Sequence, residues 1–327
     1  MRVGLAGMGS IGSRHLDTLG SLAGVEIAAV ADPRVAAEGS PPPGELPLFA
    51  SYEEMLETAE LDAVLLCTPS FLHAEQGVAA AQRGLHVIAE KPMAITLEDA
   101  DAVLQAATVA GVHVAVLHQY RFHAPMVALR QLVANGALGD VVFLNIAFNW
   151  RRDPAYYAAH GGWRGTWERD GGGALMNQGA HAVDLARWLV GPISSVTAHM
   201  VNVRHQIEAE DTVCVALEFS DGGLGTIQVT TCAARNQPVS VRYEGTAGSA
   251  ILADQTLVVN GDAAVEPPVG PPSQTFAHRA QFVEIFRSLA SGGTPPVAGP
   301  DARATLAATL AMYESASRAR AVTLEDQ

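Results

Sequence analysis

One lysine stands in a chain that otherwise uses arginine for its long basic side chains. The 327 residues include 20 Lys plus Arg, of which 19 are arginines, so Lys91 in "VIAEKPMAIT" is the single lysine. Arginine stays protonated in proteins, whereas burial or a neighbouring cation lowers the pKa of a lysine toward neutrality. Lys91 is therefore a candidate proton-transfer group. The alternative is a structural cation on a solvated face.

A second group of reactive side chains lies in "DGGGALMNQGAHAVDLARWL" (170–189). Asn177, His181, Asp184 and Trp188 follow at i, i+4, i+7 and i+11, which places them on one helix face. His181 could move a proton or bind a hydroxyl, and Asp184 could orient it. The three glycines would let backbone approach a ligand closely. The alternative is an amphipathic helix whose histidine is held by a nearby acid, and no metal site is expected.

A glycine-rich loop near the N-terminus has the spacing G-x-G-x-x-G. It follows an apolar run directly, opens a helical pattern, and precedes an acid at the end of the next apolar run, Asp32. This order is the dinucleotide-binding fingerprint, in which glycines allow pyrophosphate to approach a helix N-terminus. The predicted contacts in the loop are Gly7, Gly9, Ser10, Ile11 and Gly12. The alternative is a tight turn that binds nothing.

The acid after the second apolar run indicates which dinucleotide is bound. Asp32 would bond the adenine ribose hydroxyls and repel a 2′-phosphate, which favours NAD over NADP. Arg34 lies two residues on and could soften that preference. FAD is the lesser alternative.

Apolar runs alternate with helical patterns up to about residue 122, which predicts a parallel, doubly wound sheet. A helix near 124–135 then precedes long strand-like runs joined by tight turns, which favour an antiparallel sheet. One helix near 178–190 interrupts these runs, and two more follow near 276–290 and 301–319. The expected α/β chain thus has an N-terminal dinucleotide-binding domain, 1–122, and a C-terminal α/β domain with a large, mostly antiparallel open sheet, 123–327.

Composition excludes several classes of partner. The net charge of −14 argues against nucleic acid and anionic membranes. No apolar run approaches the ~18 residues of a membrane helix, and the N-terminus lacks the apolar core of a signal peptide. The three cysteines are far apart and odd in number, which favours a reducing cytoplasm over a disulfide framework.

The ordered motifs resemble those of the glucose–fructose oxidoreductase and inositol dehydrogenase family, Gfo/Idh/MocA. The resemblance rests on "GLAGMGSIGSRH", "DAVLLCTPSFLHAE", "VIAEKPMA", "YRF", "WRGTWERDGGGALMNQGAHAVDLARWLVG" and "EGTAGS". It implies a Rossmann domain and a second domain whose open sheet forms a homodimer or homotetramer interface. It also implies that the C-terminal helix can pack back on the first domain. Most members oxidise or reduce a hydroxyl or carbonyl of a sugar, polyol or related small molecule.

The resemblance assigns catalytic roles to Lys91 and His181. Many polyol dehydrogenases of the family have aspartate where this chain has Asn177, and the asparagine form resembles members acting on nucleotide-linked or other substituted sugars. Asparagine cannot accept a proton, so proton handling falls on Lys91 and His181, with Asn177 positioning the substrate.

Further assignments follow from the same resemblance. Cofactor contacts fall on Thr68, Pro69, His73, Glu90 and Lys91. Substrate contacts fall on Arg121, Trp163, Arg164, Asn177 and His181. For Trp163 and Trp167 the alternative is ordinary core packing.

We therefore expect an NAD(H)-dependent dehydrogenase, with NADP less favoured, that oxidises a secondary hydroxyl of a small-molecule sugar, sugar derivative or polyol. Two other functions occur in the same family. One is a non-redox, NAD-binding sugar sensor or regulator, and the other is an NAD-dependent glycosidase with no net redox change. A cofactor held through successive turnovers is a further variant.

Overall fold

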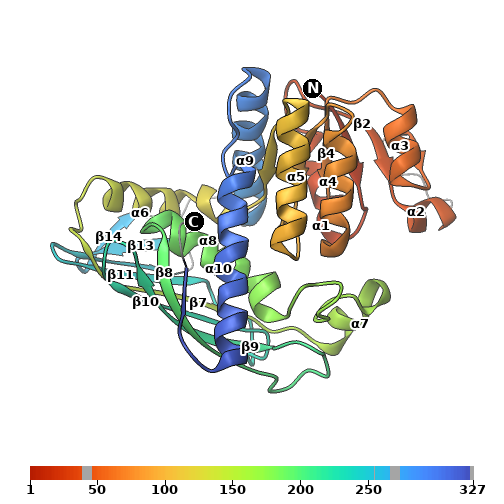
Figure 1. Ribbon diagram of the computed structural model, residues 1–327. Helices are drawn as coiled ribbons and strands as arrows, with labels where there is room; N and C mark the ends of the chain where they lie inside the picture. Colours follow the sequence, from red (N-terminus) through yellow and green to blue (C-terminus); the bar gives the residue numbers. More distant parts are fainter. Residues whose placement is uncertain (39–45, 254, 266–272, 325–327) are drawn as a thin grey trace. The chain divides into compact units, whose positions relative to one another are not determined.

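The computed structural model describes residues 1–38, 46–253, 255–265 and 273–324 (Figure 1). The chain divides into two compact units. The first comprises Met1–Gln119 with Gln274–Arg303, and the second comprises Tyr120–Ser273 with Ala304–Gln327. The boundary thus lies three residues before the expected one, and residues 274–303 join the first unit although we expected them in the second domain.

The first unit is built on a six-stranded sheet of order β3-β2-β1-β4-β5-β6, in which every pair is parallel. Its strands are β1 (Arg2–Ala6), β2 (Glu26–Ala31), β3 (Leu48–Phe49), β4 (Ala63–Leu66), β5 (His86–Ala89) and β6 (Val114–Val116). Every residue of β4 is buried, as a strand covered on both faces requires. The predicted doubly wound sheet is confirmed.

Helices connect these strands, and short polar side chains begin two of them. The helices before the second unit are α1 (Ser10–Leu19), α2 (Pro33–Glu38), α3 (Tyr52–Thr58), α4 (His73–Ala81) and α5 (Leu97–Ala110), with a 3₁₀ turn η1 (Ser70–Leu72). The Ser51 hydroxyl accepts a hydrogen bond from the Glu54 N–H, and the Thr96 hydroxyl accepts one from the Asp99 N–H, both at 3.1 Å. These caps satisfy helix N–H groups that have no intrahelical partner.

Helix α9 (Ser273–Ala290) belongs to the first unit because its apolar side chains enter that unit's core. Phe282, Ile285 and Leu289 pack in one buried cluster with Leu5 and Leu65 of the central strands. These contacts explain why a segment distant in sequence folds with the dinucleotide-binding domain.

The second unit carries a nine-stranded sheet of order β14-β13-β12-β11-β7-β10-β9-β8-β15. The strands are β7 (Val141–Asn149), β8 (Ile193–Val201), β9 (Thr212–Phe219), β10 (Leu224–Thr230), β11 (Ser240–Gly245), β12 (Ser249–Ala253), β13 (Thr256–Val259), β14 (Asp262–Val265) and β15 (Val322–Thr323). Every pair is antiparallel except β7 with β10. The predicted large, mostly antiparallel sheet is therefore confirmed.

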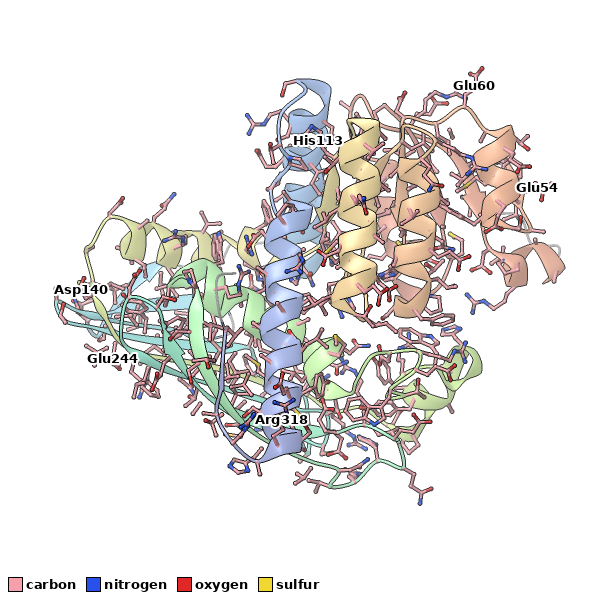
Figure 2. All side chains as sticks on the ribbon, viewed as in Figure 1. Glu54, Glu60, His113, Asp140, Glu244 and Arg318 are labelled. Carbon is pink, nitrogen blue, oxygen red and sulfur yellow. The ribbon has the colours of Figure 1, made fainter. Side chains whose placement is uncertain are left out.

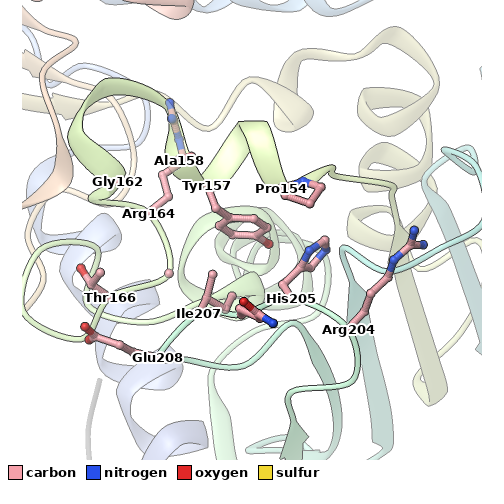
Figure 3. Close-up of a pocket in the computed structure, with 12 residues that line it drawn as sticks. Pro154, Tyr157, Ala158, Gly162, Arg164, Thr166, Arg204, His205, Ile207 and Glu208 are labelled. Carbon is pink, nitrogen blue, oxygen red and sulfur yellow. The ribbon is translucent and has the colours of Figure 1, made fainter.

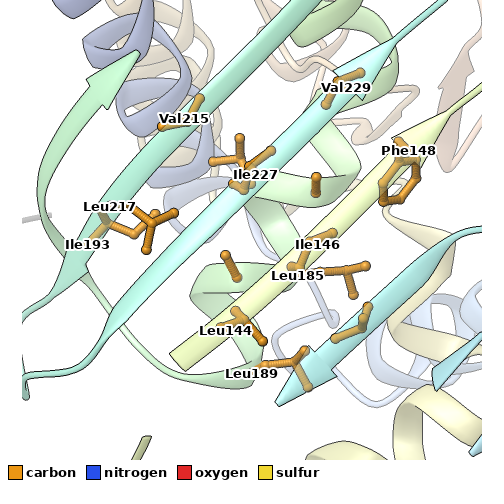
Figure 4. Packing of buried hydrophobic residues seen from close by; sticks show 14 of the residues in the cluster. Leu144, Ile146, Phe148, Leu185, Leu189, Ile193, Val215, Leu217, Ile227 and Val229 are labelled. Atoms are coloured by element: carbon orange, nitrogen blue, oxygen red, sulfur yellow. The ribbon is translucent and has the colours of Figure 1, made fainter. Parts of the chain in front are cut away.

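Helices cover one face of this sheet (Figure 1). They include α6 (Ala124–Ala134), α8 (Ala180–Leu189) and α10 (Gly299–Arg318), with α7 (Pro154–Gly162), the 3₁₀ turn η2 (Gln119–Phe122) and the π-helical turn η3 (Leu175–Gly179) beside them. Leu185 and Leu189 of α8 pack with Leu144 and Ile146 of β7 in the buried core (Figure 4). Burial alternates along β9, as expected for a sheet covered on one face.

The charged side chains labelled in Figure 2, such as Glu54, Glu60 and Arg318, lie on the outside of their units. Glu54 and Glu60 are exposed in the first unit, and Glu314 pairs with exposed Arg318 on α10 at 2.7 Å. Across the described ranges, no helix is both long enough and apolar enough to span a bilayer.

Candidate active site

The glycine loop joins β1 to α1, and its three glycines face different surroundings. Gly7 has a φ of +92°, and a Cβ there would lie 2.7 Å from the Cys67 carbonyl oxygen. A Cβ on Gly12 would lie 1.9 Å from the Gly7 carbonyl oxygen, so α1 packs directly against the loop. A Cβ on Gly9 meets no atom within 4 Å. The loop therefore leaves open space at the helix N-terminus, where a dinucleotide pyrophosphate fits.

Asp32 follows β2 and is buried beside this loop. Its Oδ2 accepts a hydrogen bond from the Met8 N–H at 2.8 Å, and its Oδ1 accepts one from the Arg34 N–H at 2.9 Å. The Arg34 guanidinium lies 3.0 Å from Oδ2. Burial raises the pKa of Asp32, but these hydrogen bonds outweigh burial and hold the pKa below its usual value. The carboxylate is thus an anion fixed next to the glycine loop, as NAD recognition requires.

We expect Asp32→Ser to shift the preference from NAD toward NADP by about tenfold or more, because the substitution removes the charge that repels a 2′-phosphate. It also releases Arg34 from its ion pair. The measurement is the ratio of NADH to NADPH dissociation constants for wild type and variant. Asp17→Ser removes the same charge from an exposed position on α1 and should leave the ratio unchanged. An unchanged ratio in Asp32→Ser would contradict the role given to this acid.

Lys91 lies in a turn directly after β5, next to a buried carboxylate. The Glu90 N–H donates to the Leu66 carbonyl at 2.9 Å, and the Lys91–Pro92 peptide is cis. Glu90 Oε1 lies 2.7 Å from His15 Nε2, and Glu90 Oε2 accepts a hydrogen bond from the Lys91 N–H at 3.2 Å. Burial opposes ionisation of Glu90, yet His15, His278 and Lys91 together lower its pKa to about 2. These neighbours favour the ionised form of Glu90, which lies next to the single lysine in the chain.

His73 joins the two loops that follow β4 and β5. Its Nδ1 lies 2.8 Å from the Pro92 carbonyl oxygen, and its Nε2 lies 2.9 Å from the Thr68 carbonyl oxygen. The ring is buried, and burial lowers its pKa. We predicted Thr68, Pro69, His73 and Glu90 as cofactor contacts. The ring nitrogens of His73 and the Glu90 carboxylate bind protein groups that shape the Lys91 turn, and the four cofactor contacts remain predictions.

The helix with the second reactive group begins with a π-helical turn, η3, and continues as α8. Asn177 Nδ2 lies 3.5 Å from Asp170 Oδ1, and Asn177 Oδ1 accepts a hydrogen bond from Gln178 Nε2 at 3.2 Å. His181 is buried, with its ring edge-on to Tyr120 at 4.9 Å between centroids. The helix therefore presents an amide and an imidazole in ordered surroundings. Their partners Asp170 and Tyr120 could not be predicted from the sequence.

Arg121 and Asp184 form a buried ion pair in the second unit. The Arg121 Nε and one terminal nitrogen donate to the two carboxylate oxygens of Asp184 at 2.8 and 2.5 Å. The guanidinium also lies 5.9 Å from the Trp188 ring centroid. Arg121, predicted as a substrate contact, is thus bound to Asp184. Asp184, predicted to orient His181, has both oxygens engaged by Arg121.

Trp163 and Arg164, also predicted as substrate contacts, lie together after α7. Trp163 is buried, and the Arg164 guanidinium stacks 4.7 Å from its ring centroid and 4.7 Å from that of Tyr156. Arg164 also lines a cavity of about 810 Å³ within the second unit, together with Tyr157, His205 and nine other residues (Figure 3). Trp167 is half exposed, so core packing applies to Trp163 but not to Trp167.

Among the residues that the structure describes, two groups of side chains bring metal-ligating atoms within 4.8 Å of one another. The sequence did not reveal them because their members are far apart along the chain. They are His15, Glu90 and His278, and His205, Asp211 and Cys232. In the first group Glu90 binds His15 and a backbone N–H. In the second, the Asp211 carboxylate accepts hydrogen bonds from three successive backbone N–H groups, at 203–205. The carboxylate of each group is therefore held by protein hydrogen bonds.

Both units of the chain match known protein families. The oxidoreductase family with an NAD-binding Rossmann fold matches residues 1–118. The GFO/IDH/MocA C-terminal domain matches residues 126–251.

Individual relatives match along nearly the whole chain. The rhizopine catabolism protein MocA of Rhizobium meliloti is 30% identical over 97% of this chain and 95% of its own. Myo-inositol 2-dehydrogenase of Thermotoga maritima is 28% identical over 100% of this chain and 99% of its own. The crystal structure of the WlbA dehydrogenase from Bordetella pertussis, in complex with NADH and UDP-GlcNAcA, is 32% identical, with a TM-score of 0.87 over 100% of this chain and 99% of the other.

Proposed function

Because the chain belongs to the GFO/IDH/MocA family of NAD-binding oxidoreductases, we propose that it oxidises a secondary hydroxyl of a substituted sugar to a ketone. The reaction removes a hydride from the carbon and a proton from its hydroxyl oxygen. When bound, NAD supplies the hydride acceptor. The chain supplies the proton acceptor and the substrate geometry, and dehydrogenases of the sugar type among its relatives support this assignment.

Lys91 is the residue on which the proposed chemistry depends. It follows a parallel strand of the dinucleotide-binding sheet, and ligands of open α/β sheets bind at the carboxyl ends of their strands. The observation that carries the proposal is that this turn is held by Glu90, His15 and His73 and holds the single lysine of the chain. A lysine so placed can take the hydroxyl proton, which an arginine could not.

We propose His181 and Asn177 as the further residues of the catalytic set. We assign His181 to share the hydroxyl proton with Lys91, and Asn177 to position the sugar. An amide binds hydroxyl groups as donor and acceptor without ionising. The two side chains are one helical turn apart, so a single sugar ring can contact both.

The proposed substrate class is a sugar with a nucleotide-linked or acidic substituent. Asn177 favours it over a free polyol, and the similar WlbA dehydrogenases were crystallised with UDP-GlcNAcA. The cavity beside Arg164 has room for part of a large substrate, since ligand pockets commonly enclose about 300–1,000 Å³.

The test is NADH formation by the purified protein with UDP-GlcNAcA, other nucleotide sugars, levoglucosan, free aldoses and myo-inositol. Turnover that is fastest with nucleotide sugars supports the proposal. Turnover with myo-inositol alone contradicts the substrate class. NADH binding without any turnover contradicts the dehydrogenase and favours a sensor, whereas release of free sugar without NADH identifies a redox-neutral hydrolase.

We expect His181→Asn to lower kcat by about 10²-fold, because general acid–base groups contribute roughly that factor or more. His199→Asn makes the same change at an exposed position on β8 and should keep the wild-type rate. Initial rates with the best substrate of the panel, at a saturating NAD concentration, provide the comparison. A wild-type kcat in His181→Asn would remove this residue from the proposed mechanism.

We further propose a homodimer or homotetramer formed through the open face of the second unit's sheet. That face exposes Leu224 on β10 and Ile251 on β12. Light scattering on the purified protein gives the mass, and a monomer at micromolar concentration would contradict the proposal.

A further inference from the structure

The helix that carries Asn177 and His181 has an unusual set of partners at its N-terminus. The first four N–H groups of any helix lack partners within the helix. Here they belong to residues 173–176, since the Asn177 N–H donates to the Gly173 carbonyl in the first intrahelical bond. Two residues far away in sequence, Glu210 and Tyr313, accept hydrogen bonds from all four.

Glu210 accepts three of these N–H groups. Its backbone carbonyl accepts from the Ala174 N–H at 2.9 Å. Its Oε1 accepts from the Leu175 N–H at 2.7 Å, and its Oε2 accepts from the Gly173 N–H at 3.2 Å. A carboxylate in this place also interacts favourably with the positive end of the helix dipole.

Tyr313 of α10 completes the set. Its hydroxyl oxygen accepts from the Met176 N–H at 3.1 Å and shares the Gly173 N–H at 3.2 Å. The same hydroxyl donates to Glu210 Oε1 at 3.0 Å, which links the two capping residues. The ring is held by Trp167, whose centroid lies 5.3 Å away in an edge-on contact.

The glycines before the helix make this approach possible. A Cβ on Gly172 would lie 2.1 Å from the Tyr313 hydroxyl oxygen, and a Cβ on Gly173 would lie 1.9 Å from the Glu210 carbonyl oxygen. We expected these glycines to let backbone approach a ligand. In the structure they bring the helix N-terminus against Glu210 and Tyr313.

We propose that Glu210 and Tyr313 are positioning residues for substrate binding, which fix the first helical turn and thereby place Asn177 and His181. This role rests on the proposed function, because it concerns the same sugar site. Asn177 is the first residue after the capped N–H groups, so a displaced first turn moves its amide directly.

Ionisation of Glu210 should make the capping by Glu210 and Tyr313 depend on pH. Burial raises the pKa of this carboxyl to about 7, although hydrogen bonds from Leu175, Tyr313 and Gly173 act to lower it. Tyr313 is the titratable group that faces this carboxyl. Burial also raises the pKa of Tyr313. The adjacent Asp211 carboxylate is bound to the N–H groups of 203–205. The groups that hydrogen-bond the Glu210 carboxylate, namely the N–H groups of Gly173, Leu175 and Glu210 itself and the Tyr313 hydroxyl, are all donors, so the ionised form matches them and the protonated form does not.

The test compares Tyr313→Phe with Tyr243→Phe, each of which removes one hydroxyl from the second unit. Tyr243 bonds the Gly139 carbonyl, outside this helix. We expect Tyr313→Phe to lower kcat/KM for the sugar about tenfold, to leave the NADH dissociation constant unchanged, and to speed amide hydrogen exchange at 173–177. Tyr243→Phe should do none of these. Thermal unfolding of each variant confirms that it is folded.

Glu210→Gln provides a second variant with a pH readout. In the wild type, protection of the 173–177 amides against hydrogen exchange should fall as pH drops through about 7, while Glu210→Gln, which cannot ionise, should lack that step. A Tyr313→Phe variant with wild-type kcat/KM and wild-type exchange, or a Glu210→Gln variant that retains the step, overturns the positioning role alone. Absence of wild-type turnover with every sugar overturns the proposed function, and this role with it.

Discussion

Lys91→Met should lower kcat by about 10³-fold while the NADH dissociation constant stays within about twofold of the wild-type value. The expected loss lies within the range that positioned acid–base groups contribute. Cofactor affinity should persist, since the glycine loop and Asp32 lie on other segments of the first unit and keep their contacts. Steady-state rates and NADH fluorescence titration measure the two effects separately.

Lys91→Arg separates charge from proton transfer at the same position. Arginine keeps a positive charge at this position but stays protonated, so its kcat should be as low as that of Lys91→Met. Arg83→Met removes an exposed cation in the first unit and serves as the control for net charge. If Lys91→Arg kept the wild-type rate, the lysine would act through its charge, and the proton would have another acceptor.

Gly12→Ala and Gly9→Ala should separate folding from cofactor binding within one loop. The added Cβ of Gly12→Ala would overlap the Gly7 carbonyl oxygen at 1.9 Å, which forces α1 away from the loop. We expect a loss of about 3 kcal/mol or more in unfolding free energy, at the upper end of overpacking effects. NADH binding should be lost with it.

Gly9→Ala adds the same methyl group at a position where the protein leaves room for it. No atom lies within 4 Å of the added Cβ, so the unfolding temperature without cofactor should match the wild type. NADH affinity should still fall by about tenfold or more, because the methyl group enters the space through which the pyrophosphate approaches. Thermal unfolding with and without NADH measures both variants. Wild-type NADH binding by Gly9→Ala would place the pyrophosphate elsewhere.

Features formed by neighbouring residues could be predicted from the sequence by itself. The glycine loop, Asp32, and the caps at Ser51 and Thr96 each depend on groups a few residues apart or on one strand–helix–strand unit. Strand and helix patterns likewise follow from burial that repeats every two or about four residues. These local rules were enough to predict the parallel sheet, the antiparallel sheet and NAD as the cofactor.

Only the tertiary structure decided which polar groups meet across long separations. Glu210 and Tyr313 bind an N-terminus 35 and 137 residues away, respectively, and each looks like an ordinary surface or core residue in sequence. Arg121 lies 63 residues from Asp184, and the sequence offered no sign of this ion pair. Helix α9 joined the first unit through side chains whose apolar pattern fits any core. Periodicity indicates that a side chain is buried, but its partner depends on how the elements pack.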